Sequence, residues 1–257
     1  MTTRMRQTGE FCWFNILTPK PAEARTFFGQ LLDWTYTEIP GMGHTVQVGG
    51  RDVGGLFDLE APGTPPGYPP TIGVMLKVDN ADDVCAKVKA LGGQAMTPFD
   101  IMDRGRMAVC HDPNGAEFDL WEPKSHPGTD VDDMLHGAPC WFETLTTDVD
   151  RARTFYSELF GWTSEIMPMP GGGDGDYTVF KRGDLYVAGL MAIQPEMGAK
   201  PHWATNFTVQ DADVTAQKAE ELGGKVFIPV NDVPGIGRSC GVTSPQGVTF
   251  YPFQRLC

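Results

Sequence analysis

The sequence predicts an α+β fold in which four modules of the order βαβββ form two tandem domains. Two observations lead to this prediction. The chain contains a long internal repeat, and each quarter shows the same succession of strand-like runs around one helix-like run. We expect each domain to carry one curled, mixed sheet of eight strands flanked by helices.

The repeat is clearest near the start of each half. The segment CWFNILTPKPAEARTFFGQLLDW at 12–34 returns as CWFETLTTDVDRARTFYSELFGW at 140–162, with 11 of 23 aligned positions identical. Later segments return in the same order at a spacing of about 130 residues, which is longer than a solenoid repeat and indicates a duplicated domain. We therefore expect one domain at 1–124, a polar linker at 125–137 and a second domain at 138–257.

Each module is expected to begin with a strand and a helix. In the first module a strand at 12–17 precedes a helix at 21–32, which starts at Pro21 and has apolar residues at helical spacing. In the second, a helix at 81–91 follows Asn80 and ends at a Gly-Gly pair. Gly-rich turns separate the remaining strands. The strands expected in the first half, which the second half copies from Cys140, are 12–17, 35–39, 44–48, 53–59, 72–78, 94–98, 106–110 and 116–121.

Composition excludes several classes of protein. The chain has 33 Asp and Glu against 20 Lys and Arg, a formal net charge of −13, so it lacks the clustered cations that nucleic acids and anionic membranes require. No apolar run of about 18 residues and no signal peptide is present, which favours a cytoplasmic protein. Six cysteines without a CxxC pair are expected to be reduced thiols.

Several motifs together carry a resemblance to a known family. They are the segment at 140–162, the LGG turns at 91–93 and 222–224, and the DPNG-type turns at 112–115 and 244–247. On these motifs, which span nearly the whole chain, the sequence resembles the vicinal oxygen chelate superfamily of glyoxalase I, extradiol dioxygenases, fosfomycin-modifying enzymes and bleomycin-resistance proteins. The resemblance implies paired modules whose sheets curl into half-barrels with a ligand on the concave face. In the family's enzymes a divalent metal is bound there.

The resemblance also implies where metal ligands would stand, namely as His, Glu or Gln on the first and last strands of the modules. By motif position the first strands offer Asn15, Gly73, Glu143 and Ala204, and the last strands offer Asp119, Tyr251 and, with a less certain alignment, Asp58. No histidine falls on these positions. The five histidines are His44, His111, His126, His136 and His202, of which His111 is expected to be a hydrogen-bonded turn residue.

Two pairings of the modules are open. If the first module pairs with the second, Asn15 and Asp119 share a face; if it pairs with the fourth, Asp119 and Glu143 come together as two carboxylates without a third donor. Neither arrangement completes a family-type metal site. We therefore predict no metal and no other cofactor, with a bound divalent ion as the alternative.

The period of two along each strand sorts the side chains by face. Trp13 and Asn15 then point inward, and Cys12 and Cys140 are expected to face the helices as small buried apolar groups. Flat aromatic walls with few polar groups suit a planar or amphipathic organic ligand. The candidate ligand-binding residues are Trp13, Asn15, Gly73, Glu117, Asp119, Trp121, Trp141, Glu143, Tyr251 and Phe253.

These observations favour a small-molecule binding protein of the vicinal oxygen chelate type, a monomer or a homodimer, over a metal-dependent lyase, isomerase or dioxygenase. No catalytic residue is predicted, because no GxSxG elbow is present and no cysteine has a neighbouring His or Asp relay. Gly73 leaves room in the first half and Asp119 adds a hydrogen-bond acceptor there, whereas the corresponding residues of the second half, Ala204 and Tyr251, fill space. The main ligand site is therefore expected in the first half.

Overall fold

The structure is a computed structural model, and it describes residues 4–62, 64–170, 175–194 and 198–256. The first half contains β1 (Phe11–Thr18), α1 (Pro21–Leu32), β2 (Thr35–Ile39), β3 (Gly43–Val48), β4 (Arg51–Asp58), β5 (Thr71–Lys77), α2 (Ala81–Ala90), β6 (Gln94–Ala95), β7 (Phe99–Ile101), β8 (Gly105–His111) and β9 (Glu117–Pro123). The second half contains β10 (Pro139–Thr146), α3 (Val149–Phe160), β11 (Thr163–Pro168), β12 (Asp176–Arg182), β13 (Leu185–Ala192), β14 (His202–Thr208), α4 (Ala212–Glu221), β15 (Lys225–Val233), β16 (Gly237–Thr243) and β17 (Thr249–Arg255). None of the helices among these residues is long and apolar enough to span a membrane.

Local signals set the helix starts. The side chains of Asn80, Asp148 and Asp211 each accept a backbone N–H three residues further on, which caps α2, α3 and α4. Helix α1 has no side-chain cap and begins at Pro21, whose fixed φ suits the first turn. The expected strand at 94–98 is split into β6 and β7, because Pro98 lacks the N–H that a continuous ladder needs.

Two mixed sheets confirm the predicted α+β fold. The first runs β2-β3-β4-β1-β5-β9-β8-β6, with β7 paired to β8 beside this path, and the second runs β11-β12-β13-β10-β14-β17-β16-β15. In the first sheet β1 is parallel to β4 and antiparallel to β5, so the first and second modules share one sheet. The alternative in which the first module pairs with the fourth is therefore not adopted.

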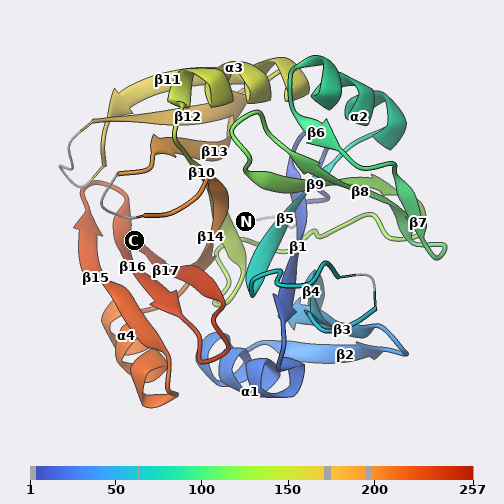
Figure 1. Ribbon diagram of the computed structural model, residues 1–257. Helices are drawn as coiled ribbons and strands as arrows, with labels where there is room; N and C mark the ends of the chain where they lie inside the picture. Colours follow the sequence, from blue (N-terminus) through green and yellow to red (C-terminus); the bar gives the residue numbers. More distant parts are fainter. Residues whose placement is uncertain (1–3, 63, 171–174, 195–197, 257) are drawn as a thin grey trace.

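Both sheets curl, and they lie back to back. Figure 1 shows the second sheet as an open arc on the left and the first sheet as another on the right, with the helices at the periphery. Strand β14 lies against β5 and β9, where the two backs meet. The concave faces consequently open in opposite directions, away from the contact between the halves.

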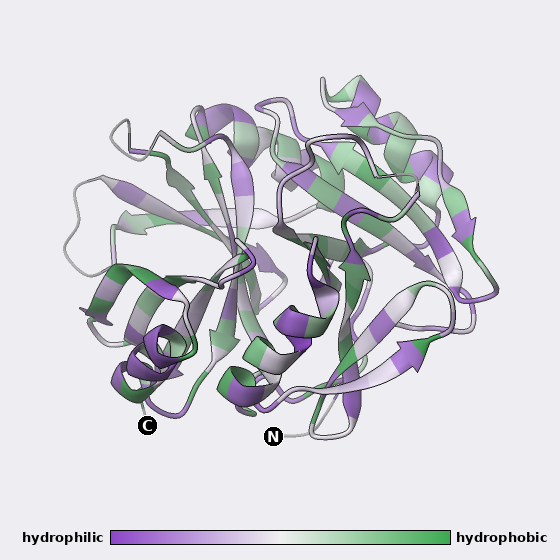
Figure 2. Cartoon of the chain, turned by 60° about the horizontal axis from the view of Figure 1, so that its bottom comes forward, coloured by the Kyte–Doolittle hydropathy of each residue, from purple (hydrophilic) through white to green (hydrophobic). Residues whose placement is uncertain are grey.

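Each hydrophobic core is built by both halves. Helix α1 packs beside α4, and Phe28 on α1 lies 5.2 Å from Phe250 of β17 between ring centroids. Helix α2 packs beside α3, so that Val88 shares a core with Phe155. Figure 2 shows hydrophilic and hydrophobic residues alternating around these helices, as expected when only one side of each is covered. The boundaries predicted for two domains stay a prediction, since both cores cross them.

A β-bulge at Cys12, repeated at Cys140, corrects one expectation. The pairing of β1 with β5 shifts between Phe11 and Trp13, and that of β10 with β14 shifts at the corresponding place. The extra residue puts Phe11 on the helix side, so that Cys12 packs instead against Met75, whose carbonyl accepts its thiol at 3.6 Å. Cys140 likewise lies on a cavity between the halves. The prediction that both thiols face the helices was wrong.

Candidate functional site

The floor of the first concave face consists of neighbouring positions in four strands. Asn15 stands opposite Gly55 in β4 and opposite Gly73 in β5, and Met75 stands opposite Asp119 in β9. A Cβ atom at Gly73 would lie 3.6 Å from Asp119 Oδ2. The carboxyl group of Asp119 therefore leans over the space that Gly73 leaves free, and the structure brings the predicted residues Asn15, Gly73 and Asp119 together.

Asp119 is the unusual group of this face. Its exposed fraction is 6%, and its Oδ1 atom has no hydrogen-bond partner among the described residues. Burial, followed by the charge of Glu117, raises the pKa of Asp119 well above its usual range. A buried oxygen without a partner costs about 1–3 kcal/mol. A hydrogen bond from a ligand would recover that free energy.

Glu117, two residues earlier on the same face, is fully engaged. Tyr68, from the connection between the first two modules, donates its hydroxyl to Glu117, and His111 Nε2 lies 3.2 Å from the other carboxylate oxygen. Burial alone would raise the pKa of Glu117, but these two hydrogen bonds lower it below the usual range. The hydrogen bond with Glu117 raises the pKa of His111.

The sequence contained a signal for half of this cluster. The DPNG turn joins β8 to β9 and places His111 opposite Glu117 in the hairpin, so the pair followed from turn length and strand pairing. His111 was expected only as a turn residue. No local pattern predicted the contact of Tyr68 with Glu117, because Tyr68 lies in a loop 49 residues earlier in the chain.

The aromatic walls differ from the expectation of open stacking surfaces. The Trp121 indole N–H donates to the His126 carbonyl at 2.9 Å, and only 7% of Trp121 is exposed. Trp13 meets the His126 ring edge-on, with centroids 4.7 Å apart. The linker thus runs over both tryptophans, and Trp121 lies beneath it. Sequence reasoning assigned His126 to the linker without placing it on this face.

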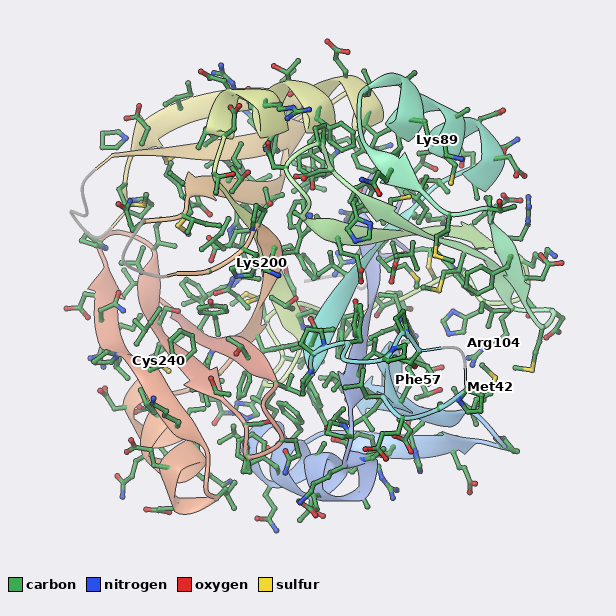
Figure 3. The ribbon with its side chains drawn as sticks, in the orientation of Figure 1. Met42, Phe57, Lys89, Arg104, Lys200 and Cys240 are labelled. Carbon is green, nitrogen blue, oxygen red and sulfur yellow. The ribbon has the colours of Figure 1, made fainter. Side chains whose placement is uncertain are left out.

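Two residues of β4 also depart from expectation. The Phe57 ring lies over Gly55, since a side chain at Gly55 would collide with it, and Figure 3 shows Phe57 within the strands of the first sheet. Phe57 therefore adds an apolar wall beside Asn15. Asp58 pairs with Thr18 rather than with Asn15 and accepts the N–H of Glu60, so it belongs to the turn after β4 and not to this face.

The second concave face satisfies its own polar groups. The hydroxyl of Tyr177 fills the space over Gly189, donates to Glu143 Oε2 at 2.9 Å and accepts the Trp141 indole N–H at 2.8 Å. Asn206 donates to Glu143 Oε1 at 3.4 Å. Burial raises the pKa of Glu143, and these hydrogen bonds oppose that effect. The Tyr177 side chain, which sequence reasoning missed, fills a space in the second half that is open at the corresponding place in the first half.

The other predicted residues of the second half lie at the β17 end of the same sheet. Tyr251 stands opposite Asn206 and meets Phe227 edge-on with centroids 6.0 Å apart. Burial, with the charge of Glu143, raises the pKa of Tyr251 to about 12. Phe253 lies on the same strand and approaches Gly237. Because the sheets are back to back, these residues form a face separate from that of Asn15 and Asp119.

Comparison with known proteins places this arrangement in a family. The sequence model of the Glyoxalase/Bleomycin resistance protein/Dioxygenase superfamily matches residues 11–120 and 141–250. CFP32 of Mycobacterium tuberculosis, named a candidate glyoxylase, is 36% identical over 244 residues, covering 93% of this chain and 92% of that protein. The anthracycline biosynthesis protein DnrV of Streptomyces peucetius is 32% identical over 257 residues, covering 94% and 92%.

Solved structures share the fold at low sequence identity. The Mn(II)-bound glyoxalase of Novosphingobium aromaticivorans has a TM-score of 0.66 and 11% identity, covering 98% of this chain and 83% of that one. Homoprotocatechuate 2,3-dioxygenase of Brevibacterium fuscum has a TM-score of 0.66 and 12% identity, covering 98% and 82%. With the family matched in both halves, this chain belongs to the Glyoxalase/Bleomycin resistance protein/Dioxygenase superfamily.

Proposed function

We propose that this chain is a small-molecule binding protein whose main site is the first concave face. Asn15 and Asp119 would orient a planar or amphipathic organic ligand there, with Trp13 and Phe57 as apolar walls. One observation carries the proposal: Asp119 is buried with Oδ1 unpaired and Oδ2 beside the space left at Gly73, whereas Glu143, the carboxylate of the second face, is hydrogen-bonded by Tyr177 and Asn206. A buried acceptor without a partner can be satisfied by a ligand donor.

The donors of this face do not fit the divalent metal that the family implies. A family-type ion needs three or four N or O ligands with open positions for substrate. Asn15 offers an amide oxygen, Gly73 offers no side chain, and Asp119 offers one carboxylate whose ionisation is disfavoured. Glu117 is already bound by Tyr68 and His111. Across the described part of the chain, no group of three or more His, Cys, Asp or Glu side chains is arranged to hold a metal. The first concave face therefore does not fit a family-type metal ion.

A metal-dependent lyase, isomerase or dioxygenase is the second candidate, and the family match and the name of CFP32 favour it. Metal analysis separates the two. After dialysis against metal-free buffer, we expect zinc, nickel, iron and manganese each to stay well below one equivalent per chain, because too few donors converge. A stoichiometric content of any of them would favour the second candidate.

The chemistry of Asp119 narrows the ligand class. In its protonated form, which burial favours by raising the pKa, the Asp119 carboxyl group presents both an O–H donor and a carbonyl acceptor, and the Asn15 amide also presents one of each. Such a pair suits carbonyl and hydroxyl groups at the edge of a ring system. Two relatives are named for anthracycline biosynthesis, and anthracyclines are planar ring systems that carry such groups. An anthracycline is therefore the first probe.

The decisive comparison is Gly73→Ala in the first half against Ala204→Gly at the corresponding position of the second. A Cβ atom at Gly73 would meet Asp119 Oδ2 at 3.6 Å and the Asn15 carbonyl at 3.8 Å, which are ordinary contacts, so the fold tolerates it. The methyl group nevertheless occupies the space in front of Asp119. In fluorescence titrations we expect Gly73→Ala to weaken anthracycline binding about tenfold or more, a change of about 1.4 kcal/mol.

Ala204→Gly is the matched control and should leave the affinity unchanged. Thermal unfolding should show Gly73→Ala to be as stable as the parent or slightly more so, since alanine loses less backbone entropy than glycine. Equal loss of affinity in both variants, or loss in Ala204→Gly alone, would place the ligand elsewhere and contradict the proposal.

A further inference from the structure

A cavity lies at the junction between the halves. It has a volume of about 90 Å³ and lies where the starts of β1 and β10 approach each other beside the N-terminal segment. Its lining includes Arg4, Arg6, Glu10, Trp13, Asp133 and Trp141. Apart from Trp13, none of them belongs to the floor or walls of the first concave face.

Arg6 is the cation of this cavity that has no acid of its own. Its Nη2 atom donates to the Val131 carbonyl at 3.2 Å, and no carboxylate among the described residues forms an ion pair with it. Lys77 Nζ donates to the Arg6 carbonyl at 2.9 Å and brings a further positive charge close by. Burial lowers the pKa of Arg6, which reflects the cost of removing its charge from water.

The two acids of the cavity are already paired with other arginines. Glu10, which is almost fully buried, lies 2.9 Å from Arg4 and 3.3 Å from Arg182. Asp133 lies 3.2 Å from Arg255. The lining itself holds two arginines and two acids, but Arg182 and Arg255 pair with those acids from outside the cavity and leave Arg6 without an ion pair in the described part of the chain. A guanidinium group without an ion pair can form charge-assisted hydrogen bonds with an anion.

The walls indicate what kind of anion would fit. Trp13 and Trp141 occupy corresponding positions in the two halves and both line the cavity, so it combines aromatic surfaces with a guanidinium group. Guanidinium binds carboxylate through two parallel hydrogen bonds, and aromatic surfaces suit a flat ring. We propose that this junction cavity binds a small planar monocarboxylate, with its carboxylate on Arg6 and its ring against Trp13 and Trp141.

Benzoate tests this proposal, and the indole N–H signals in an ¹⁵N–¹H NMR titration show where it binds. The chain has six tryptophans. We expect the signals of Trp13 and Trp141 to move, while those of Trp34 and Trp203, which lie in the two cores, stay in place. Benzamide, which has the same shape without the charge, should bind at least about tenfold more weakly. This comparison uses the unaltered protein and needs no variant to fold.

Arg6→Gln should weaken benzoate binding at least about tenfold, because a charged hydrogen-bond donor is lost. Arg153→Gln, which removes a surface arginine of α3 outside the cavity, should leave it unchanged. Gly73→Ala should also have no effect on benzoate, which separates this site from the proposed anthracycline site. Equal binding of benzamide, or full affinity in a folded Arg6→Gln protein, would overturn the proposal.

Discussion

Replacing Asp119 by asparagine is expected to raise the free energy of unfolding at pH 7 by about 1 kcal/mol or more. Burial raises the pKa of Asp119, so ionisation at pH 7 costs folding free energy, and asparagine keeps the shape without an ionisable group. The stability that Asp119 contributes is present below the unfolded pKa of about 4 and is lost as the pH rises toward the folded value. The advantage of the variant should therefore grow from pH 4 to pH 7 in urea unfolding experiments.

Glu117→Gln is the matched control, because it removes the neighbouring acid, whose pKa is shifted in the opposite direction. The hydrogen bonds from His111 and Tyr68 lower the pKa of Glu117, so its contribution is present above the unfolded pKa and is lost as the pH falls. This variant should be less stable than the parent at pH 7, and the difference should shrink on acidification. If Asp119→Asn is instead destabilised at pH 7, Oδ1 has a partner in solution, and the main observation behind the proposed function is lost.

Separating the halves is expected to abolish a stable folded monomer. Neither the segment 1–124 nor the segment 138–257 can cover its own helices, because α1 packs beside α4 and α2 packs beside α3. Tyr156 of α3 joins the halves further, since it donates to Asp112 at 3.1 Å and accepts the Trp203 indole N–H at 3.0 Å. Each isolated half would expose an apolar surface that the other half covers in the intact chain.

Circular dichroism, NMR dispersion and sedimentation at low concentration would show whether each isolated half is folded and monomeric. Each half should be unfolded or should associate with a second copy, and mixing the two halves should restore the spectrum of the intact chain. A half that stays monomeric and unfolds cooperatively would show that the shared cores contribute less than the structure indicates.

Local periodicity explains why the sequence predicted the secondary structure well. Helix α1 has the predicted bounds at 21–32, and β2 matches the predicted strand at 35–39. Alternation along β1 and β9 correctly placed Asn15 and Asp119 on one face, because side chains two apart in a strand share a face whatever surrounds them. The same rule failed at Cys12, where one extra residue shifts the alternation.

The sequence by itself determined the duplication, the order of elements in each module and the side chains offered to each concave face, because strand and helix periods depend only on residues a few positions apart. The tertiary structure alone decided which helices share a core, that the linker runs over Trp13 and Trp121, and that Tyr177 satisfies Glu143 while Asp119 Oδ1 stays unpaired. These contacts join residues distant in the chain. They depend on how whole sheets pack against each other, and no local pattern carries that information.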